Sequence, residues 1–129
     1  MSNEQTLPIR WDLTGEDAIV QGADWRREEL ISYETGPWNT AGYTAFATFR
    51  TDYDSAVVLS CTTENGRIEV GIQGISPNQR NIAITLTSAA TKTLTTYGLM
   101  VWDLWLKDST GHETMVHNGQ AVLVRRVSP

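Results

Sequence analysis

The sequence predicts an all-β fold, namely an immunoglobulin-like antiparallel β-sandwich with one short helix near residues 88–94. Short runs rich in Thr, Val, Ile, Trp and Tyr recur along the chain, and these residue types favour strands. Gly, Asn, Asp and Pro separate the runs at intervals of about 8–12 residues, the spacing of turns in a sandwich. With 129 residues, the chain is long enough to bury one core without cross-links.

The amino-terminal part holds three expected strands. Residues 1–13 are interpreted as an arm or a first strand, because a polar stretch precedes the apolar residues of Ile9–Leu13. Residues 14–129 are expected to form a single sandwich domain, whose next strand is Ala18–Gln21. Trp25–Tyr33 alternates only in part, and its charged centre could also begin a helix, but a strand is the favoured interpretation.

Two strands and a hairpin are expected in the middle of the chain. Tyr43–Arg50 alternates aromatic or apolar residues with small ones, as a half-exposed strand does. Val57–Thr62 is a more continuous apolar run. Asn65-Gly66 predicts a type I′ hairpin turn after this run, since Asn and Gly tolerate the positive φ values of that turn. The next strand starts at Ile68 and gives way to a loop over residues 71–80.

The last part of the chain carries the strongest strand pattern. Asn81–Thr87 alternates strictly, and Ser88 is expected to cap the short helix that continues to Leu94. Leu99–Lys107 places four large apolar residues on one face, and these are expected to enter the core: Met100, Trp102, Leu104 and Leu106. Two further strands, Glu113–His117 and Gln120–Val127, complete the expected set.

Composition bounds the partners of the protein. The net charge of −5 makes nucleic acid an unexpected partner, because phosphate binding needs a basic surface. No apolar run approaches the length of a membrane span, so no membrane partner is expected. The amino terminus lacks the pattern of a signal peptide, which favours assembly in the cytoplasm. The single cysteine, Cys61, is expected to be a buried small hydrophobe.

Motifs that carry chemistry are missing from the sequence. There is no Gly-x-Ser-x-Gly nucleophile motif and no phosphate-binding glycine loop before a helix. His112 and His117 lie five positions apart, which places them on opposite faces of a strand and favours two surface histidines over a metal site. We therefore expect no enzymatic activity, no metal and no cofactor.

Apolar surface is the strongest functional signal. If Trp102 enters the core, Val101 and Trp105 point to the outer face, where they indicate contact with another chain unless the helix or the amino-terminal arm covers them. Trp38 lies in the loop of residues 35–42, where a tryptophan either plugs the core or acts as a contact hot spot. The candidate interface residues are Trp11, Trp38, Val101 and Trp105.

The segments that carry a resemblance to a known family are Thr62-Thr63-Glu64-Asn65-Gly66-Arg67-Ile68, Ser88-Ala89-Ala90, Tyr97-Gly98, Trp102-Asp103-Leu104, Asp108-Ser109-Thr110-Gly111, and Gly119 with the Val-rich strand after it. Together they resemble small structural proteins of tailed bacteriophages, and also the amino-terminal domain of siphophage upper baseplate proteins. The resemblance covers roughly residues 15–127. In such proteins an aromatic-Asp-Leu strand precedes a Ser-x-Gly turn, and a glycine opens the last strand.

The resemblance implies a non-enzymatic virion building block, in the tail, the baseplate or the attachment of a fibre. It implies other virion proteins as partners, a homo-oligomeric or multi-copy assembly, and a location in the virion. Upper baseplate proteins continue into a part that holds receptor-binding proteins, whereas here we expect the sandwich to be the whole module. Capsid decoration therefore stays open, as does a carbohydrate-binding module that uses Trp38, Tyr43 and Trp105.

Overall fold

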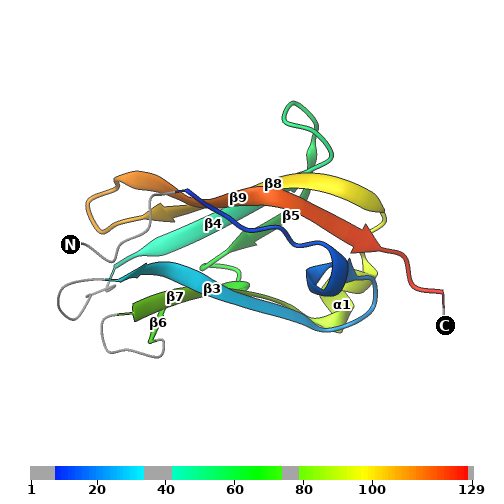
Figure 1. Ribbon diagram of the computed structural model, residues 1–129, viewed down its shortest axis with the longest axis horizontal. Coiled ribbons are helices and arrows are strands. Elements are labelled where there is room, and N and C mark those ends of the chain that lie inside the picture. The colour runs from blue at the N-terminus through cyan, green and yellow to red at the C-terminus, as the bar shows by residue number, and fades with distance from the viewer. Residues whose placement is uncertain (1–7, 34–41, 74–78, 128–129) are drawn as a thin grey trace.

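Two facing β-sheets form the protein, and together they confirm the predicted all-β sandwich (Figure 1). The computed structural model describes residues 8–33, 42–73 and 79–127. Within these ranges the larger sheet has six strands in the order β1-β9-β8-β4-β5, with β2 also pairing with β9, and the smaller sheet has the order β3-β7-β6. No helix in the described part of the chain is long and apolar enough to cross a membrane.

Some strand bounds agree with the sequence pattern, whereas the expected loop over residues 71–80 is too long, because one strand continues to Gln73 and the next begins at Gln79. Trp25–Tyr33 and Val57–Thr62 have the expected bounds. The elements in chain order are β1 Ile9–Arg10, β2 Ile19–Val20, β3 Trp25–Tyr33, β4 Thr44–Arg50, β5 Val57–Thr62, β6 Ile68–Gln73, β7 Gln79–Leu86, α1 Ser88–Lys92, β8 Gly98–Lys107 and β9 Glu113–Val124, with a single 3-10 turn at Gly15–Asp17.

The core lies between the two sheets. The four apolar residues predicted for the inner face of β8 are all buried, which confirms that assignment: Met100, Trp102, Leu104 and Leu106. The Trp102 ring stacks on Phe49 of β4, with 5.3 Å between ring centroids. The smaller sheet contributes Ile82 and Ile84 of β7, both without exposed area. Cys61 is buried as expected, and this burial raises the pKa of its thiol to about 12.

The amino-terminal segment makes the larger sheet a mixed one. Both β1 and β2 pair in parallel with β9, whereas the pairings among the longer strands are antiparallel as predicted. Between them Leu13 forms a parallel bridge to Ala121, and the Leu13 amide donates to the Gln120 carbonyl at 2.8 Å. The physical reason is burial, because this path places Trp11, Leu13 and Ile19 in the core.

The predicted Asn65-Gly66 hairpin is wrong, because the chain crosses there from one sheet to the other. β5 belongs to the larger sheet and β6 to the smaller one. Gly66 has a φ of 78°, but no described non-glycine residue has a positive φ, so the turn is not type I′. Instead the Asn65 side chain holds the crossing, because its Oδ1 accepts from the Thr62 and Arg67 amides at 3.0 and 3.1 Å.

Two further expectations about the last third need correction. The cap of α1 is Thr87, not Ser88, because the Thr87 Oγ1 accepts the Ala90 amide at 3.2 Å. The two expected strands after residue 112 are one strand, β9, which keeps its pairing with β8 by means of a bulge. Leu104 lies opposite His117 and Trp105 opposite Met115, so Val116 is the extra residue.

The bulge explains why His117 is not the surface residue that spacing predicted. It has no exposed area, and its ring lies edge-on to Trp11 with 5.1 Å between centroids. Its Nδ1 lies 3.1 Å from the Ile9 carbonyl oxygen, while Nε2 is buried without a hydrogen-bond partner among the described residues. Burial lowers the pKa of His117, against the opposing effect of the Ile9 carbonyl.

Candidate functional site

The structure separates the candidate interface residues. Trp11 is only 7% exposed and packs edge-on to Trp102 at 5.5 Å, so it belongs to the core and not to a contact surface. Trp38 lies outside the described residues. Val101 and Trp105 do point to the outer face of β8, where both are half-buried. The Trp105 ring lies parallel to Phe46 on the neighbouring strand, 6.4 Å away, so its surface is partly covered within its own sheet.

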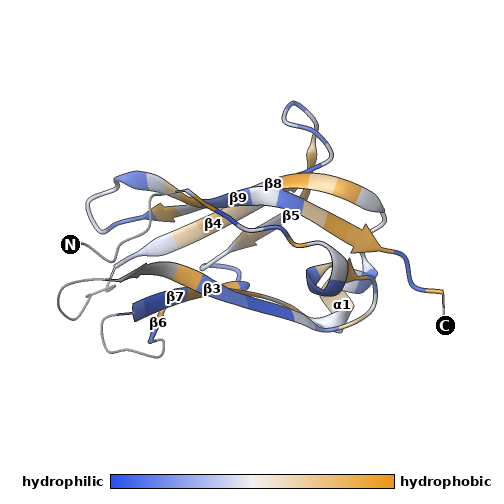
Figure 2. Cartoon of the chain, in the orientation of Figure 1, coloured by the Kyte–Doolittle hydropathy of each residue, from blue (hydrophilic) through white to orange (hydrophobic). Residues whose placement is uncertain are grey.

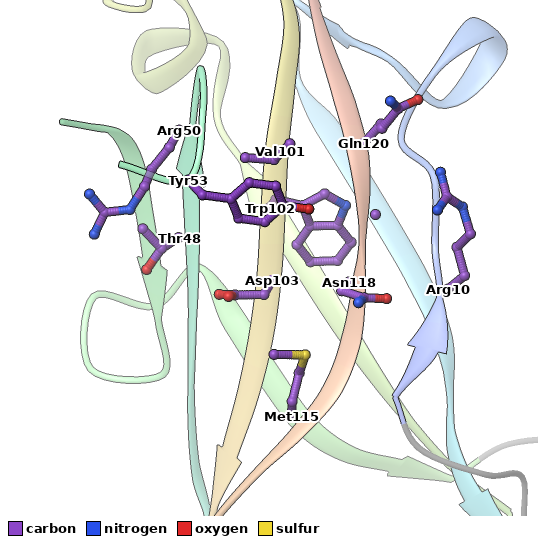
Figure 3. Close-up of a pocket in the computed structure, with 11 residues that line it drawn as sticks. Arg10, Thr48, Arg50, Tyr53, Val101, Trp102, Asp103, Met115, Asn118 and Gln120 are labelled. Carbon is purple, nitrogen blue, oxygen red and sulfur yellow. The ribbon is translucent and has the colours of Figure 1, made fainter. Parts of the chain in front are cut away.

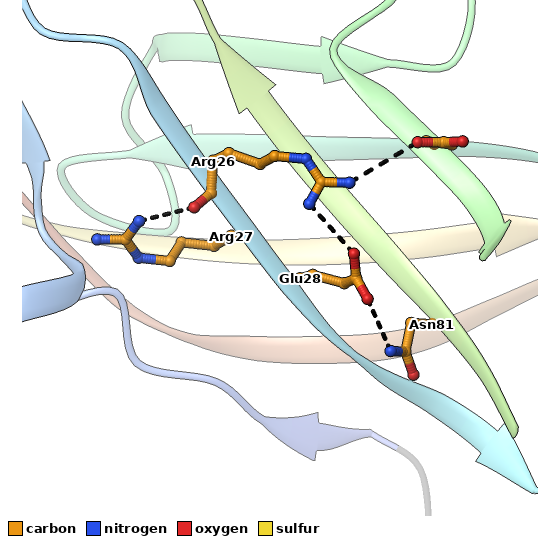
Figure 4. A network of polar contacts seen from close by, with 5 residues as sticks. Arg26, Arg27, Glu28 and Asn81 are labelled. Carbon is orange, nitrogen blue, oxygen red and sulfur yellow. Dashed lines mark hydrogen bonds and ion pairs between the residues drawn. The ribbon is translucent and has the colours of Figure 1, made fainter. Parts of the chain in front are cut away.

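The outer face of the smaller sheet is covered by a network of charges (Figure 4). Arg26 donates to Glu28 at 3.1 Å, and Asn81 donates to the other Glu28 oxygen at 2.9 Å. A second carboxylate, that of Glu69, lies 3.8 Å from Arg26. The hydrogen bonds from Asn81 and Arg26 lower the pKa of Glu28. These polar groups bond to one another, and Ala83, between Glu28 and Glu69 in the strand register, is buried. This face therefore has the properties of a solvated surface.

The outer face of the larger sheet is organised differently, in rows that follow the strand register. One row crosses four strands and is polar; it consists of Thr48, Asp103, Asn118 and Arg10. The next row towards the carboxyl end of β9 is Arg50, Val101 and Gln120. The row after that pairs Leu99 with Val122. The face therefore changes from polar to apolar along β8 and β9.

A hollow of about 230 Å³ lies over the first two rows (Figure 3). Its lining includes Thr48, Tyr53, Val101, Asp103, Asn118 and Gln120. The side chain of Tyr53 reaches over the sheet from the turn between β4 and β5, and it is 80% exposed. In the described part of the chain, four of these side chains make no hydrogen bond to another residue: Thr48, Asp103, Asn118 and Gln120.

The apolar end of the same face forms what we name the apolar patch, which consists of Val20, Leu99, Val122 and Val124. Three of these side chains are among the exposed large hydrophobic residues, with Leu99 the most exposed at 56%. Val20 and Val124 are register partners, as are Leu99 and Val122. Figure 2 shows the corresponding hydrophobic colour at the adjoining ends of β8 and β9. Solvent-exposed apolar residues that cluster in this way mark contact sites more often than isolated ones do.

Part of the apolar patch was within reach of sequence reasoning. Leu99 lies on the same face as Val101 and Trp105 by simple alternation. Val20 was not accessible from local pattern, because its place beside Val124 depends on the parallel pairing of β2 with β9. The exposed Tyr97 precedes β8 and is not counted in the patch, because its hydroxyl accepts from Gln21 at 2.9 Å and the Arg125 guanidinium lies over its ring.

The described residues offer no metal centre, because no three His, Cys, Asp or Glu side chains among them lie close enough to hold an ion. The Cys61 thiol could act as a nucleophile and the His117 ring as an acid or base, but both are buried in the core and neither lines the hollow. The outer face of the larger sheet thus has a polar hollow at one part and an apolar patch at another.

Comparison with known proteins leaves the family of this chain open. No family model matches it, and no curated protein matches it. Among solved structures the chain is similar to CopC from Methylosinus trichosporium OB3b, with 11% sequence identity over 87% of this chain and 88% of that chain, and a TM-score of 0.35. A likeness of that size carries no argument about function.

Proposed function

We propose that this protein is a non-enzymatic building block of a bacteriophage virion, an assembly or adaptor module of the tail, the baseplate or a fibre attachment. The observation that carries the proposal is the apolar patch, where Val20, Leu99 and Val124 are each between 39% and 56% exposed. In this proposal the patch docks on another virion protein. The resemblance of the sequence segments to tailed-phage structural proteins supplies the biological setting.

The contrast between the two outer faces supports the patch as the docking surface. Ion pairs and hydrogen bonds among Arg26, Glu28 and Asn81 cover the smaller sheet, so binding there would strip water from charges that are already paired. Docking on Leu99 and Val124 removes apolar area from water, which favours association at about 25 cal/mol per Å². The patch therefore suits the centre of an interface with a polar rim.

Purified particles of the phage that encodes this chain provide the test. Mass spectrometry is expected to find the protein in the particles in many copies, and cryo-imaging is expected to place it at the tail, the baseplate or a fibre attachment. Absence of the protein from washed particles would overturn the proposal.

Capsid decoration is the alternative that the same docking surface allows. A decoration protein would dock its apolar patch onto a capsid subunit. The patch residues therefore do not distinguish a decoration protein from a tail adaptor. The position of the protein in the imaged particle distinguishes these two roles, because density on the head supports decoration and density on the tail supports the adaptor.

A further inference from the structure

We infer that the hollow beside Tyr53 is a binding site for a neutral saccharide. This inference goes beyond the proposed function, which needs only the apolar patch at the other end of the same face. It rests on three observations about the hollow, namely its unpaired polar side chains, its balance of charge and its exposed aromatic wall.

The unpaired polar side chains sit side by side because of the strand register. Thr48 of β4 lies opposite Asp103 of β8, and Asp103 lies opposite Asn118 of β9. Gln120 follows on the same face of β9, two residues along. Together they present a hydroxyl, a carboxylate and two amides, none of which bonds to another described residue. Such a set offers donors and acceptors at once, and the hydroxyl groups of a sugar, which both donate and accept, match it.

The charges around the hollow disfavour an ionic ligand. Arg10 and Arg50 lie at its two sides (Figure 3), and each already has a partner. Arg10 forms an ion pair with Asp12 at 2.8 Å, and this hydrogen bond lowers the pKa of the Asp12 carboxyl. Arg50 donates to the Ser55 carbonyl oxygen. Because a carbonyl oxygen does not neutralise a guanidinium, the charges of Arg50 and Asp103 remain and balance one another, so the hollow has no net charge to attract an anion or a cation.

Tyr53 supplies the aromatic wall. A side chain that is 80% exposed contributes little to the core, yet its turn is well fixed. Its backbone amide donates to Asp52 Oδ1 at 2.7 Å, and the Ser55 amide donates to the Asp52 carbonyl at 3.1 Å. The face of a tyrosine ring is apolar, so it can cover the C–H face of a sugar ring, while Val101 adds an apolar contact from the sheet below.

The dimensions of the hollow limit the ligand to a small unit. A volume of about 230 Å³ lies below the roughly 300–1,000 Å³ of sites that enclose drug-sized ligands. The hollow therefore accommodates one or two sugar rings at the end or along the side of a glycan. Because the site is shallow, we expect a dissociation constant on the order of 1 mM for a free monosaccharide.

The experiment is a two-dimensional NMR titration of the full chain. The probes are free glucose, galactose, mannose, rhamnose and N-acetylglucosamine, with inorganic phosphate as the anionic comparison. At least one sugar is expected to shift the amide signals of Tyr53, Asp103 and Asn118 in a saturable way. The variants Tyr53→Ala and Asn118→Ala are each expected to weaken that binding at least tenfold.

A matched variant separates this inference from the proposed function. Tyr97→Ala removes an exposed tyrosine that does not line the hollow, and it is expected to leave sugar binding unchanged. Tyr53→Ala is expected to leave incorporation into virions unchanged. Three outcomes would overturn the saccharide site: no saturable shift with any of the five sugars, shifts that map outside the hollow, or stronger shifts at Asp103 and Asn118 with phosphate than with any sugar.

Discussion

His117 combines full burial with a ring nitrogen that has no hydrogen-bond partner among the described residues, and its protonation is therefore linked to folding. Its pKa in the folded protein is below the ordinary value of 6.5, because burial disfavours the charged ring. Below pH 6.5 the unfolded chain binds this proton more readily than the folded one, so stability falls as the pH drops.

We predict that the contribution of His117 to the free energy of unfolding is fully present above pH 6.5. It decreases as the pH falls from 6.5 to the pKa of His117 in the folded protein. The loss is about 1.4 kcal/mol for each unit between the two pKa values. Denaturant unfolding at a series of pH values measures it. In His117→Phe the slope between pH 6.5 and 5 is expected to vanish, whereas His112→Gln, at the exposed histidine, is expected to keep it. A slope that survives in His117→Phe would contradict the assignment.

Of Trp102 and Trp105 on β8, Trp102 is expected to be the residue whose substitution lowers the free energy of unfolding more. Its indole Nε1 donates to the buried Trp11 carbonyl at 2.9 Å, across 91 residues of sequence. In Trp102→Phe this carbonyl loses its donor, which costs about 1–3 kcal/mol, and the smaller ring leaves space beside Phe49. Trp105→Phe, at the half-buried neighbour, is expected to cost less than about 1 kcal/mol. Equal losses in the two variants, measured by denaturant unfolding, would contradict this account.

At the scale of elements, Gly119 sets how closely the amino-terminal segment approaches β9. A Cβ at this position would lie 2.5 Å from the Trp11 carbonyl oxygen and 2.7 Å from Asp12 Oδ1. Neither distance is tolerable, and the Trp11 oxygen belongs to the backbone. The segment must therefore move away from β9 in any variant with a side chain here.

Gly119→Ala is expected to lower the free energy of unfolding by about 1–3 kcal/mol and to loosen this segment first. Hydrogen exchange reports the second effect, because the Trp11 amide bonds to Asn118 at 2.8 Å and the Leu13 amide to Gln120. Both amides are expected to exchange faster in the variant. Gln120→Ala serves as the control, since it shortens an exposed side chain on the same strand. Unchanged exchange at both amides in Gly119→Ala would be inconsistent with the packing described.

Local pattern predicted most elements, and long-range pairing accounts for the errors. Strand periodicity was sufficient for Trp25–Tyr33 and for the inner face of β8, because each depends only on alternation within one run. The turn at Asn65-Gly66 was misread, since a turn residue does not reveal whether the next strand joins the same sheet. The burial of His117 could not be predicted, because it follows from a bulge that appears only when β9 pairs with β8.

At the scale of the whole molecule, the outer faces of the two sheets differ in whether their polar groups pair with one another and in whether they expose apolar groups to solvent. Charges pair with one another on the smaller sheet, while the larger sheet leaves an apolar patch and a polar hollow open to solvent. The sequence indicated Val101 and Trp105 as outer-face residues, and the structure places both there. It could not indicate that Val20 joins Leu99 and Val124, because that juxtaposition requires the assembled sheet.

If the apolar patch docks on another virion protein, as we propose, charges placed in it should keep the protein out of assembled particles. The double variant Leu99→Asp with Val124→Asp places two charges where the interface would exclude water. Val57→Asp is the matched control, because Val57 is 48% exposed on β5, outside the patch. We predict that the double variant folds with near-normal stability and is depleted at least tenfold from purified particles, while the control is incorporated normally. Normal incorporation of the folded double variant would contradict the account.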